Sequence, residues 1–193
     1  MNKFFLTDID EVVLDWISEF KLFFESETGK TLIGFPKTPN MVEWIGLEKH
    51  EIRKIIDKFD QTSEIFGRLK ATRQSEIYLP KIKELGYNII AITASSTVID
   101  SIQRRKNNII KEIGDIFTNV HCVSCSTDKS IYLQLYPSSY FVEDKVLNAK
   151  MAQKIGHKGI IMRQSSNIIQ EKDNTDLIWV DNWGVIYNLL TKD

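Results

Sequence analysis

Short runs of apolar residues alternate along this chain with longer segments in which apolar residues recur at helical spacing. The apolar runs predict strands at residues 3–8, 88–93, 119–124, 139–144 and 158–163, with a last strand inside 174–190. The helical spacing predicts helices at residues 12–30, 75–86, 96–114, 129–136 and 148–156, with a last one ending near residue 190. Continuous apolar strands separated by helices are typical of a buried parallel sheet. We therefore expect an α/β fold with a Rossmann-like parallel sheet flanked by helices.

One segment interrupts this alternation between the first and second strands. It contains Pro36 and Pro39 and then shows helical periodicity from about Glu48 onward, without a convincing strand. We expect it to be all-helical from about Leu32 and to lie over the carboxyl ends of the strands, where open α/β sheets bind ligands. The expected domains are a core of residues 1–30 and 74–193 and a small helical cap of residues 31–73.

The composition narrows the class of protein. A chain of 193 residues with 42% hydrophobic and 26% charged residues is typical of one globular core with a small inserted subdomain. The net charge of -1 gives no strong signal for nucleic-acid binding. The apolar run at the N-terminus is too short for a signal peptide, and no run could span a bilayer, so we expect a cytoplasmic protein without a membrane partner. Cys122 and Cys125 are expected to be reduced thiols, and the oligomeric state is left open.

Acidic and hydroxyl residues follow three of the predicted strands. They are Asp8 and Asp10, Thr93 and Ser95, and Glu143 and Asp144. Because the carboxyl ends of parallel strands open onto one edge of the sheet, these side chains should converge, and Lys129 can reach the same edge from the start of a short helix. Carboxylates from two strands make an oxygen-rich site suited to Mg²⁺, and a lysine beside them would bind a phosphoryl group.

These motifs resemble those of the haloacid dehalogenase (HAD) superfamily of phosphohydrolases over nearly the whole chain. The segment "DIDEVVLD" (8–15) is similar to the first motif and "AITASS" (91–96) to the second. Lys129 fits the third motif, and "FVEDKVLNAKMAQKIG" (141–156) fits the fourth. Asp-x-Asp alone turns up by chance, whereas four motifs in the right order on the expected elements are specific.

The resemblance implies a role for each matching residue. Asp8 would be the nucleophile that forms an aspartyl-phosphate, and Asp10 would protonate the leaving oxygen and then activate the hydrolytic water. Lys129 would neutralise the phosphoryl charge. The phosphate-binding residues of the second motif would be Thr93, Ala94 and Ser95. Capping of the following helix remains an alternative role for the hydroxyl groups of this motif.

The resemblance also implies a Mg²⁺ cofactor. Asp8, the backbone carbonyl of Asp10 and Asp144 would hold the ion, with Glu143 bound directly or through water. The alternative is that Glu143 and Asp144 favour a helix N-terminus through its dipole.

Within the superfamily, the chain is most similar to the 5'(3')-deoxyribonucleotidase group in its length, its helical cap and its Asp15-Trp16 pair. This likeness implies a small-molecule phosphate ester as substrate, most simply a (deoxy)nucleoside monophosphate. Trp16 and Trp44 would then be candidates to stack on a nucleobase. The alternatives are a sugar phosphate, a nucleic-acid end, or a non-catalytic phosphate-binding or interaction module.

Two features depart from the family pattern or lie outside it. Glu11 stands where the family usually has glycine, so we expect a different local turn, with Glu11 facing solvent or adding charge near the metal. The basic residues Arg68, Lys70 and Arg73, and those of segment 104–106, are expected to form solvent-exposed faces, with contact to the substrate as the alternative.

Overall fold

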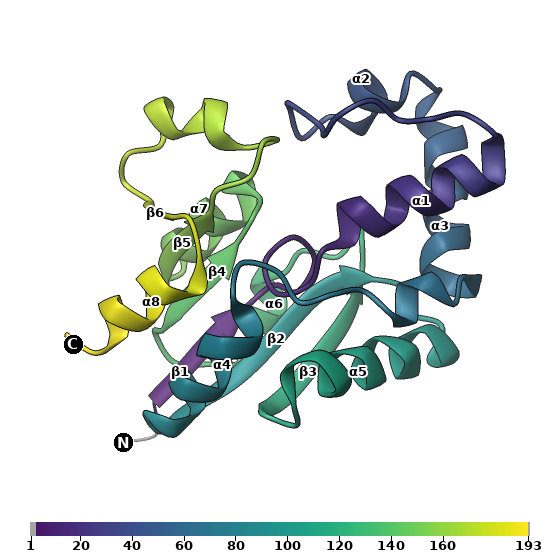
Figure 1. Cartoon of the computed structure of the whole chain (residues 1–193). Helices are drawn as coiled ribbons and strands as arrows, with labels where there is room; N and C mark the ends of the chain where they lie inside the picture. Colours follow the sequence, from purple (N-terminus) through teal and green to yellow (C-terminus); the bar gives the residue numbers. More distant parts are fainter. Residues whose placement is uncertain (1–2, 193) are drawn as a thin grey trace.

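A parallel sheet forms the centre of the molecule (Figure 1). The computed structural model describes residues 3–192, and within them the sheet has six strands. The strands are β1 (Lys3–Thr7), β2 (Tyr87–Ser95), β3 (Phe117–Ser124), β4 (Tyr140–Glu143), β5 (Lys158–Met162) and β6 (Ile178–Val180). The α-helices are α1 (Trp16–Thr28), α2 (Met41–Ile45), α3 (Lys49–Thr62), α4 (Ser75–Glu84), α5 (Ile99–Ile113), α6 (Ser130–Leu133), α7 (Val146–Lys154) and α8 (Trp183–Leu190). Two 3₁₀ helices, η1 (Ile65–Gly67) and η2 (Ile168–Asp173), complete the set.

The strand order is β3-β2-β1-β4-β5-β6, and each neighbouring pair is parallel. The predicted α/β fold with a parallel sheet is therefore confirmed. The chain first winds toward β3 and then returns past β1 to β4, so the direction of winding reverses between β1 and β4. The carboxyl ends of these two strands form the topological switch point, where open α/β sheets bind ligands.

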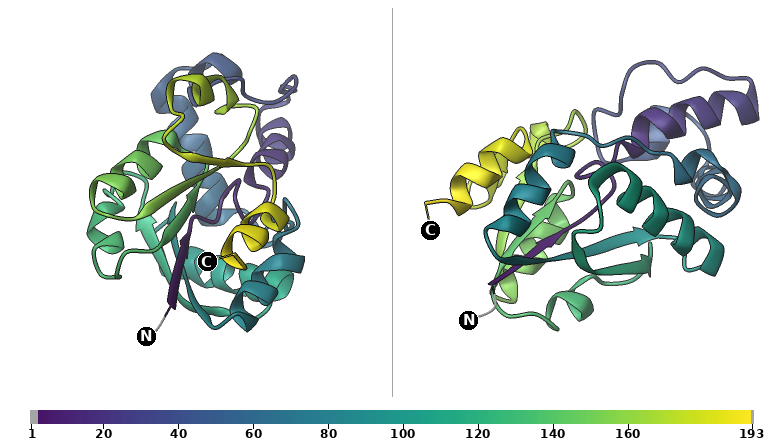
Figure 2. Two further views of the ribbon diagram at one scale, coloured as in Figure 1. Left: turned by 90° about the vertical axis from the view of Figure 1, so that its left-hand side faces the viewer. Right: turned by 60° about the horizontal axis from the view of Figure 1, so that its bottom comes forward.

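Helices cover both faces of the sheet (Figure 2). Along β1, Phe5 packs into the large hydrophobic cluster that contains Ile109 of α5, whereas Leu6 packs into a second cluster with Leu133 of α6. Side chains of a strand alternate between faces. Helices α4, α5 and α8 thus cover one face, and α6 and α7 cover the other. Among the described residues, no helix is both long and apolar enough to cross a membrane.

The first helix begins later than the periodicity predicts. Residues 9–14 form a tight turn, in which three successive N–H groups converge on one carbonyl. The donors are Val12, Val13 and Leu14, and the acceptor is Ile9 O. Asp15 then caps α1, and Gly29 ends it with a φ of 67°. The apolar side chains of the turn are all buried, so their spacing alone cannot distinguish this turn from a helix.

The inserted segment is only partly helical. Residues 30–40 form a loop, because Gly34 has a φ of 65° and Pro36 and Pro39 interrupt helical hydrogen bonding. The aromatic face of α1 packs against α3 and η1 through the rings of Trp16, Phe20, Phe23, Phe59 and Phe66. By these contacts α1 lies with the inserted helices, beyond the carboxyl ends of the strands (Figure 2). The division into a core and a cap of residues 31–73 stays a prediction, and residues 1, 2 and 193 lie outside the described part.

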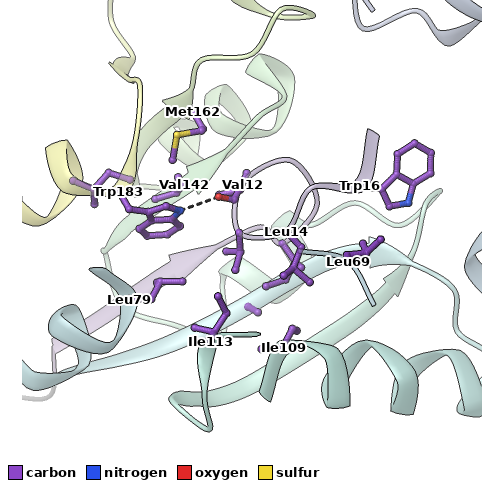
Figure 3. Close-up of a cluster of buried hydrophobic side chains, with 14 of the residues drawn as sticks. Val12, Leu14, Trp16, Leu69, Leu79, Ile109, Ile113, Val142, Met162 and Trp183 are labelled. Carbon is purple, nitrogen blue, oxygen red and sulfur yellow. Dashed lines mark hydrogen bonds between the residues drawn. The ribbon is translucent and has the colours of Figure 1, made fainter. Parts of the chain in front are cut away.

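The C-terminal helix is tied to the turn that follows β1. Trp183, the first residue of α8, is fully buried, and its Nε1 donates a hydrogen bond of 2.8 Å to Val12 O (Figure 3). Its backbone N–H donates to Arg73 O at 3.0 Å. One tryptophan therefore holds together the turn carrying Asp10, the loop before α4 and the end of the chain.

Replacing Trp183 should weaken this junction. Trp183→Phe keeps an aromatic ring but leaves the buried Val12 carbonyl without its donor, and we expect the free energy of unfolding to fall by about 1–3 kcal/mol. Urea unfolding measures the change. Trp179→Phe is the matched control, because the Trp179 indole also donates to a carbonyl, that of Asn174, but is only partly buried. An equal loss in both variants would contradict the importance of the Val12 bond.

Candidate active site

A lysine side chain joins two acidic strand ends at the switch point. Lys129, directly before α6, places Nζ 2.9 Å from Asp8 Oδ2 and 2.9 Å from Glu143 Oε1. Asp8 follows β1 and Glu143 ends β4, and all three residues are buried. The structure thus brings together three of the residues that the sequence predicts at this edge, and it makes Lys129 the link between them.

The charges in this cluster favour an ionised Asp8. Burial raises the pKa of Asp8, but the Lys129 ammonium, the hydrogen bonds with Glu143 and Lys129, and the charge of Lys145 together lower it by more, so the pKa lies below its usual value. Burial and the Asp8 charge raise the pKa of Glu143 well above its usual value. For Lys129, burial lowers the pKa, yet the two carboxylates outweigh it and the pKa is raised. Asp8 therefore remains the carboxylate of the pair, the form that a nucleophile needs.

Glu143 is held from several directions. Asn148 Nδ2 donates to Glu143 Oε1 at 3.1 Å, and the backbone N–H of Lys145 donates to Oε2 at 3.3 Å. The neighbouring Asp144 is anchored through its carbonyl, which accepts a 2.7 Å hydrogen bond from Asn167 Nδ2. Burial raises the pKa of the Asp144 carboxyl to about 6, although Lys145 lowers it in part. Both oxygens of Glu143 thus have protein partners, among them the Lys129 ammonium.

The acidic cluster fits a divalent cation. One carboxylate oxygen each of Asp8, Glu143 and Asp144 lies within 4.8 Å of the others. Such spacing allows the oxygens to converge on one ion, and carboxylate oxygens are the donors that Mg²⁺ prefers. The residues present therefore fit the expected cofactor.

Asp10 contacts a basic residue that the sequence analysis places on an exposed face and not at the site. Its Oδ1 lies 2.6 Å from Nη2 of Arg105 on α5. Arg105 is fully buried, with its guanidinium carbon 4.1 Å from the centre of the Phe66 ring. The prediction of an exposed basic face is wrong for Arg105, because α5 packs that side against the inserted segment. Burial raises the pKa of Asp10 to about 7, and Arg105 partly opposes the rise.

The second motif lies on β2, which extends to Ser95. Thr93 and Ser95 are buried, and neither hydroxyl has a hydrogen-bond partner among the described residues. Unpartnered buried hydroxyls are uncommon and are typical of sites that bind a ligand or water. Ala94 lies between them, with its carbonyl 3.9 Å from Cys125 Sγ. The phosphate-binding function of these three residues stays a prediction.

Glu11 adopts the backbone conformation that glycine would. Its φ is 63°, in the left-handed region. Its side chain turns back toward α1, where Oε1 accepts a 2.7 Å hydrogen bond from Ile17 N. Gln164 Nε2 donates to the Glu11 carbonyl. Glu11 therefore does not simply face solvent, because its carboxyl group accepts a hydrogen bond from the first turn of α1. A turn that differs from the family's, and a charge contribution of Glu11 near the metal, stay predictions.

The two tryptophans named for base stacking have other contacts. Trp16 (Figure 3) is 9% exposed, stacks on Phe20 with 4.5 Å between ring centres, and donates from Nε1 to Asp60 Oδ1 at 3.1 Å. It is part of the packing between α1 and α3, and its stacking on a nucleobase stays a prediction. Trp44 lies on α2, is partly buried, and donates to Ile33 O at 3.2 Å.

A cavity of about 290 Å³ lies beside Glu11. Phe35 from the loop before α2 lines it, together with Arg73, Gln164 and Ser165. Arg73 Nη2 donates to Gln164 Oε1 at 2.6 Å, and Ser165 Oγ donates to Pro36 O at 2.9 Å. The cavity therefore combines polar and apolar surface in similar measure, with one aromatic wall, and it lies next to the motif that carries Asp8 and Asp10.

Solved structures share this architecture. A haloacid dehalogenase-like family hydrolase from Streptococcus pneumoniae is 13% identical, with a TM-score of 0.69 over 97% of this chain and 98% of that one. The fold is that of the HAD-like hydrolases. A D,D-heptose 1,7-bisphosphate phosphatase from B. bronchiseptica, complexed with magnesium and phosphate, is 10% identical, with a TM-score of 0.59 over 98% of each chain. An L-2-haloacid dehalogenase from Xanthobacter autotrophicus is also 10% identical, with a TM-score of 0.55 over 99% of each chain. No family model and no curated protein matches the chain.

Substitutions at Glu11 should separate backbone strain from the helix contact. Glu11→Gly relieves the positive φ but loses the bond to Ile17, whereas Glu11→Ala loses the same bond and keeps the strain. We expect the alanine variant to be less stable than the glycine variant by about 1 kcal/mol. Urea unfolding of both variants measures this difference. Equal stabilities would show that the left-handed conformation at residue 11 is not maintained in solution.

Proposed function

We propose that this chain is a Mg²⁺-dependent phosphomonoesterase that works through an aspartyl-phosphate on Asp8. The observation that carries the proposal is the pairing of an ionised Asp8 with Lys129 in a HAD-like fold. A second acid, Asp10, follows Asp8 by two residues. Asp8 attacks phosphorus, and the ammonium of Lys129 offsets the charge of the phosphoryl oxygens. Thr93 and Ser95 supply hydroxyl groups that lack protein partners among the described residues, and Ala94 lies between them.

Asp10 supplies the acid-base chemistry in this proposal. A pKa of about 7 leaves part of the Asp10 population protonated at neutral pH, which suits donation to the leaving oxygen. The resulting carboxylate then takes a proton from the water that hydrolyses the aspartyl-phosphate. A halide leaves without needing a proton, so an acid in this position supports phosphate esters over haloacids as substrates.

Asp8, Asp144 and the Asp10 carbonyl would hold Mg²⁺, with Glu143 acting through water. When bound, the ion polarises the phosphoryl group and aligns it with Asp8. The hydrogen bonds from Asn148 and Lys145 occupy the oxygens of Glu143, which favours contact of Glu143 with the ion through water and not directly.

Within this chemistry, we propose a (deoxy)nucleoside monophosphate as the first substrate class to test. The cavity beside Glu11 supports it, because the ring of Phe35 offers an aromatic surface and Gln164 an amide near the site. Trp44, on the inserted segment, is a second aromatic to examine. A sugar phosphate would use the same polar groups without needing the ring.

Asp8→Asn should retain the fold and lose turnover by about 10⁴-fold or more, because the amide cannot form the phosphoryl enzyme. Phosphate release would be measured with nucleoside 5'- and 3'-monophosphates, sugar phosphates and a phosphorylated oligonucleotide, each with Mg²⁺ and with EDTA. Acid-quenched wild-type protein should carry one hydroxylamine-labile phosphoryl group, which Asp8→Asn lacks. Turnover that survives in Asp8→Asn or is unaffected by EDTA would contradict the proposed function.

A pair of lysine variants tests the charge beside Asp8. Lys129→Met should abolish turnover, because the phosphoryl oxygens and the Asp8 carboxylate both lose the ammonium that offsets their charge. Lys150→Met is the matched control and should leave turnover intact, since it alters a partly exposed lysine whose Nζ lies 3.9 Å from Asp176. The same assay of phosphate release measures both variants, and full turnover in Lys129→Met would contradict the proposed function of this lysine.

Phe35→Ala tests the substrate class. We expect KM for nucleoside monophosphates to rise about tenfold, because loss of base stacking costs about 1–3 kcal/mol, while kcat and the KM for sugar phosphates stay nearly unchanged. Ile33→Ala is the matched control, since Ile33 is highly exposed on the same loop and does not line the cavity. An equal rise in KM for both substrate classes would contradict base stacking at Phe35.

A further inference from the structure

Arg105 is a buried cation whose hydrogen-bonding capacity the fold leaves largely unused. Its Nε, Nη1 and Nη2 have no aligned hydrogen-bond acceptor among the described residues. Asp10 Oδ1 is within 2.6 Å of Nη2, close enough for a strong charge interaction. A buried ion pair contributes little to stability compared with apolar residues of the same volume. The presence of this cation next to Asp10 therefore indicates a function beyond packing.

The helix that carries Arg105 is fixed to the inserted segment by its neighbours. Ser101 Oγ donates to Asp60 O at 2.5 Å, and Asn108 Nδ2 donates to Leu69 O at 2.9 Å. Arg104 Nη2 donates to Gln61 O. Residues 101, 104, 105 and 108 share one face of a helix. This face of α5 is hydrogen-bonded to the backbone of residues 60–69. Arg105 lies on the same face, with its guanidinium over the Phe66 ring, and it is the residue of this face that contacts Asp10.

We propose that Arg105 is a positioning residue that holds the Asp10 carboxyl group for proton transfer at the leaving oxygen; this rests on the proposed phosphomonoesterase function. The guanidinium lies against Oδ1, which leaves Oδ2 as the oxygen that would exchange the proton. Phe66 supports the flat side of the guanidinium, and the hydrogen bonds from α5 to residues 60–69 set its position.

The proton transfer balances in two steps. As Asp8 Oδ bonds to phosphorus, the bond between phosphorus and the ester oxygen breaks, and the proton on Asp10 Oδ2 moves to that oxygen to release the alcohol. Water then attacks phosphorus and gives a proton to Asp10 Oδ2. As the new bond between water oxygen and phosphorus forms, the bond between phosphorus and Asp8 breaks, and phosphate is released. Arg105 exchanges no proton in either step.

Substrates that differ in leaving group test this function. An alkyl ester such as glycerol phosphate needs a proton on its leaving oxygen, whereas p-nitrophenyl phosphate does not. For Arg105→Lys we expect kcat to fall about 10²-fold with the alkyl ester and less than about tenfold with p-nitrophenyl phosphate, with KM little changed. Lys111→Arg, the reverse exchange at an exposed position of the same helix, is the matched control and should preserve the ratio of the two kcat values. An equal fall in kcat with both esters would show that Arg105 only supports the structure, and it would overturn the proposal.

A double variant gives the second readout. With the alkyl ester, adding Arg105→Lys to Asp10→Asn should cause no further loss, because Arg105 acts through Asp10. If the fall in kcat of the double variant equals the product of the falls in the two single variants, the proposal is overturned. Phe66→Leu keeps Arg105 but removes the aromatic ring on which its guanidinium rests, so it should show the same dependence on leaving group more weakly. If Arg105→Lys does not fold, the result with Phe66→Leu tests the proposal in its place.

The two proposals fail in distinguishable ways. Activity that depends on Asp8 and Asp10 but not on Arg105 would overturn the positioning function alone. Wild-type protein that is inactive with every ester would overturn the phosphomonoesterase function, and the positioning function of Arg105 with it.

Discussion

The ammonium group of Lys129 lies between two carboxylates that could not otherwise share the end of a buried sheet. Asp8 and Glu143 come from neighbouring strands at the switch point, and desolvation together with mutual repulsion would disfavour having both charged. Lys129 offsets this cost from outside both strands, at the start of a short helix. It keeps Asp8 ionised while the backbone holds Asp144 close by. The chemistry of this edge therefore depends on one residue whose position is set by the connection between β3 and β4.

Most of the sheet could be predicted from the sequence, because parallel strands buried on both faces leave continuous apolar runs. The convergence of Asp8, Lys129, Glu143 and Asp144 also followed, since parallel strands end at one edge. The start of α1 did not follow, because the buried turn at residues 12–14 has the same apolar spacing as a helix. The loop at residues 30–40 is signalled by its prolines and glycine, and the helical periodicity begins only after it, at about Glu48.

Arg105 and Trp16 show what local patterns cannot decide. A polar stripe at residues 101, 104, 105 and 108 looks the same in sequence whether it faces water or the backbone of a packed segment. Likewise, an aromatic residue beside a motif can pack inward or face a ligand. Trp16 packs inward because Phe20 and Asp60 lie next to it, and those contacts depend on how the insertion folds back. Tertiary contact, which the pattern does not contain, decides both cases.

The left-handed backbone at Glu11 has a consequence for how such motifs change over time. Glutamate and glycine codons differ by a single base, and both residues can occupy this turn, one with strain and a bond to the helix, the other with neither. A lineage can therefore exchange one for the other in one mutational step without rebuilding the turn. The turn therefore constrains a dihedral angle at this position more than it constrains the residue type.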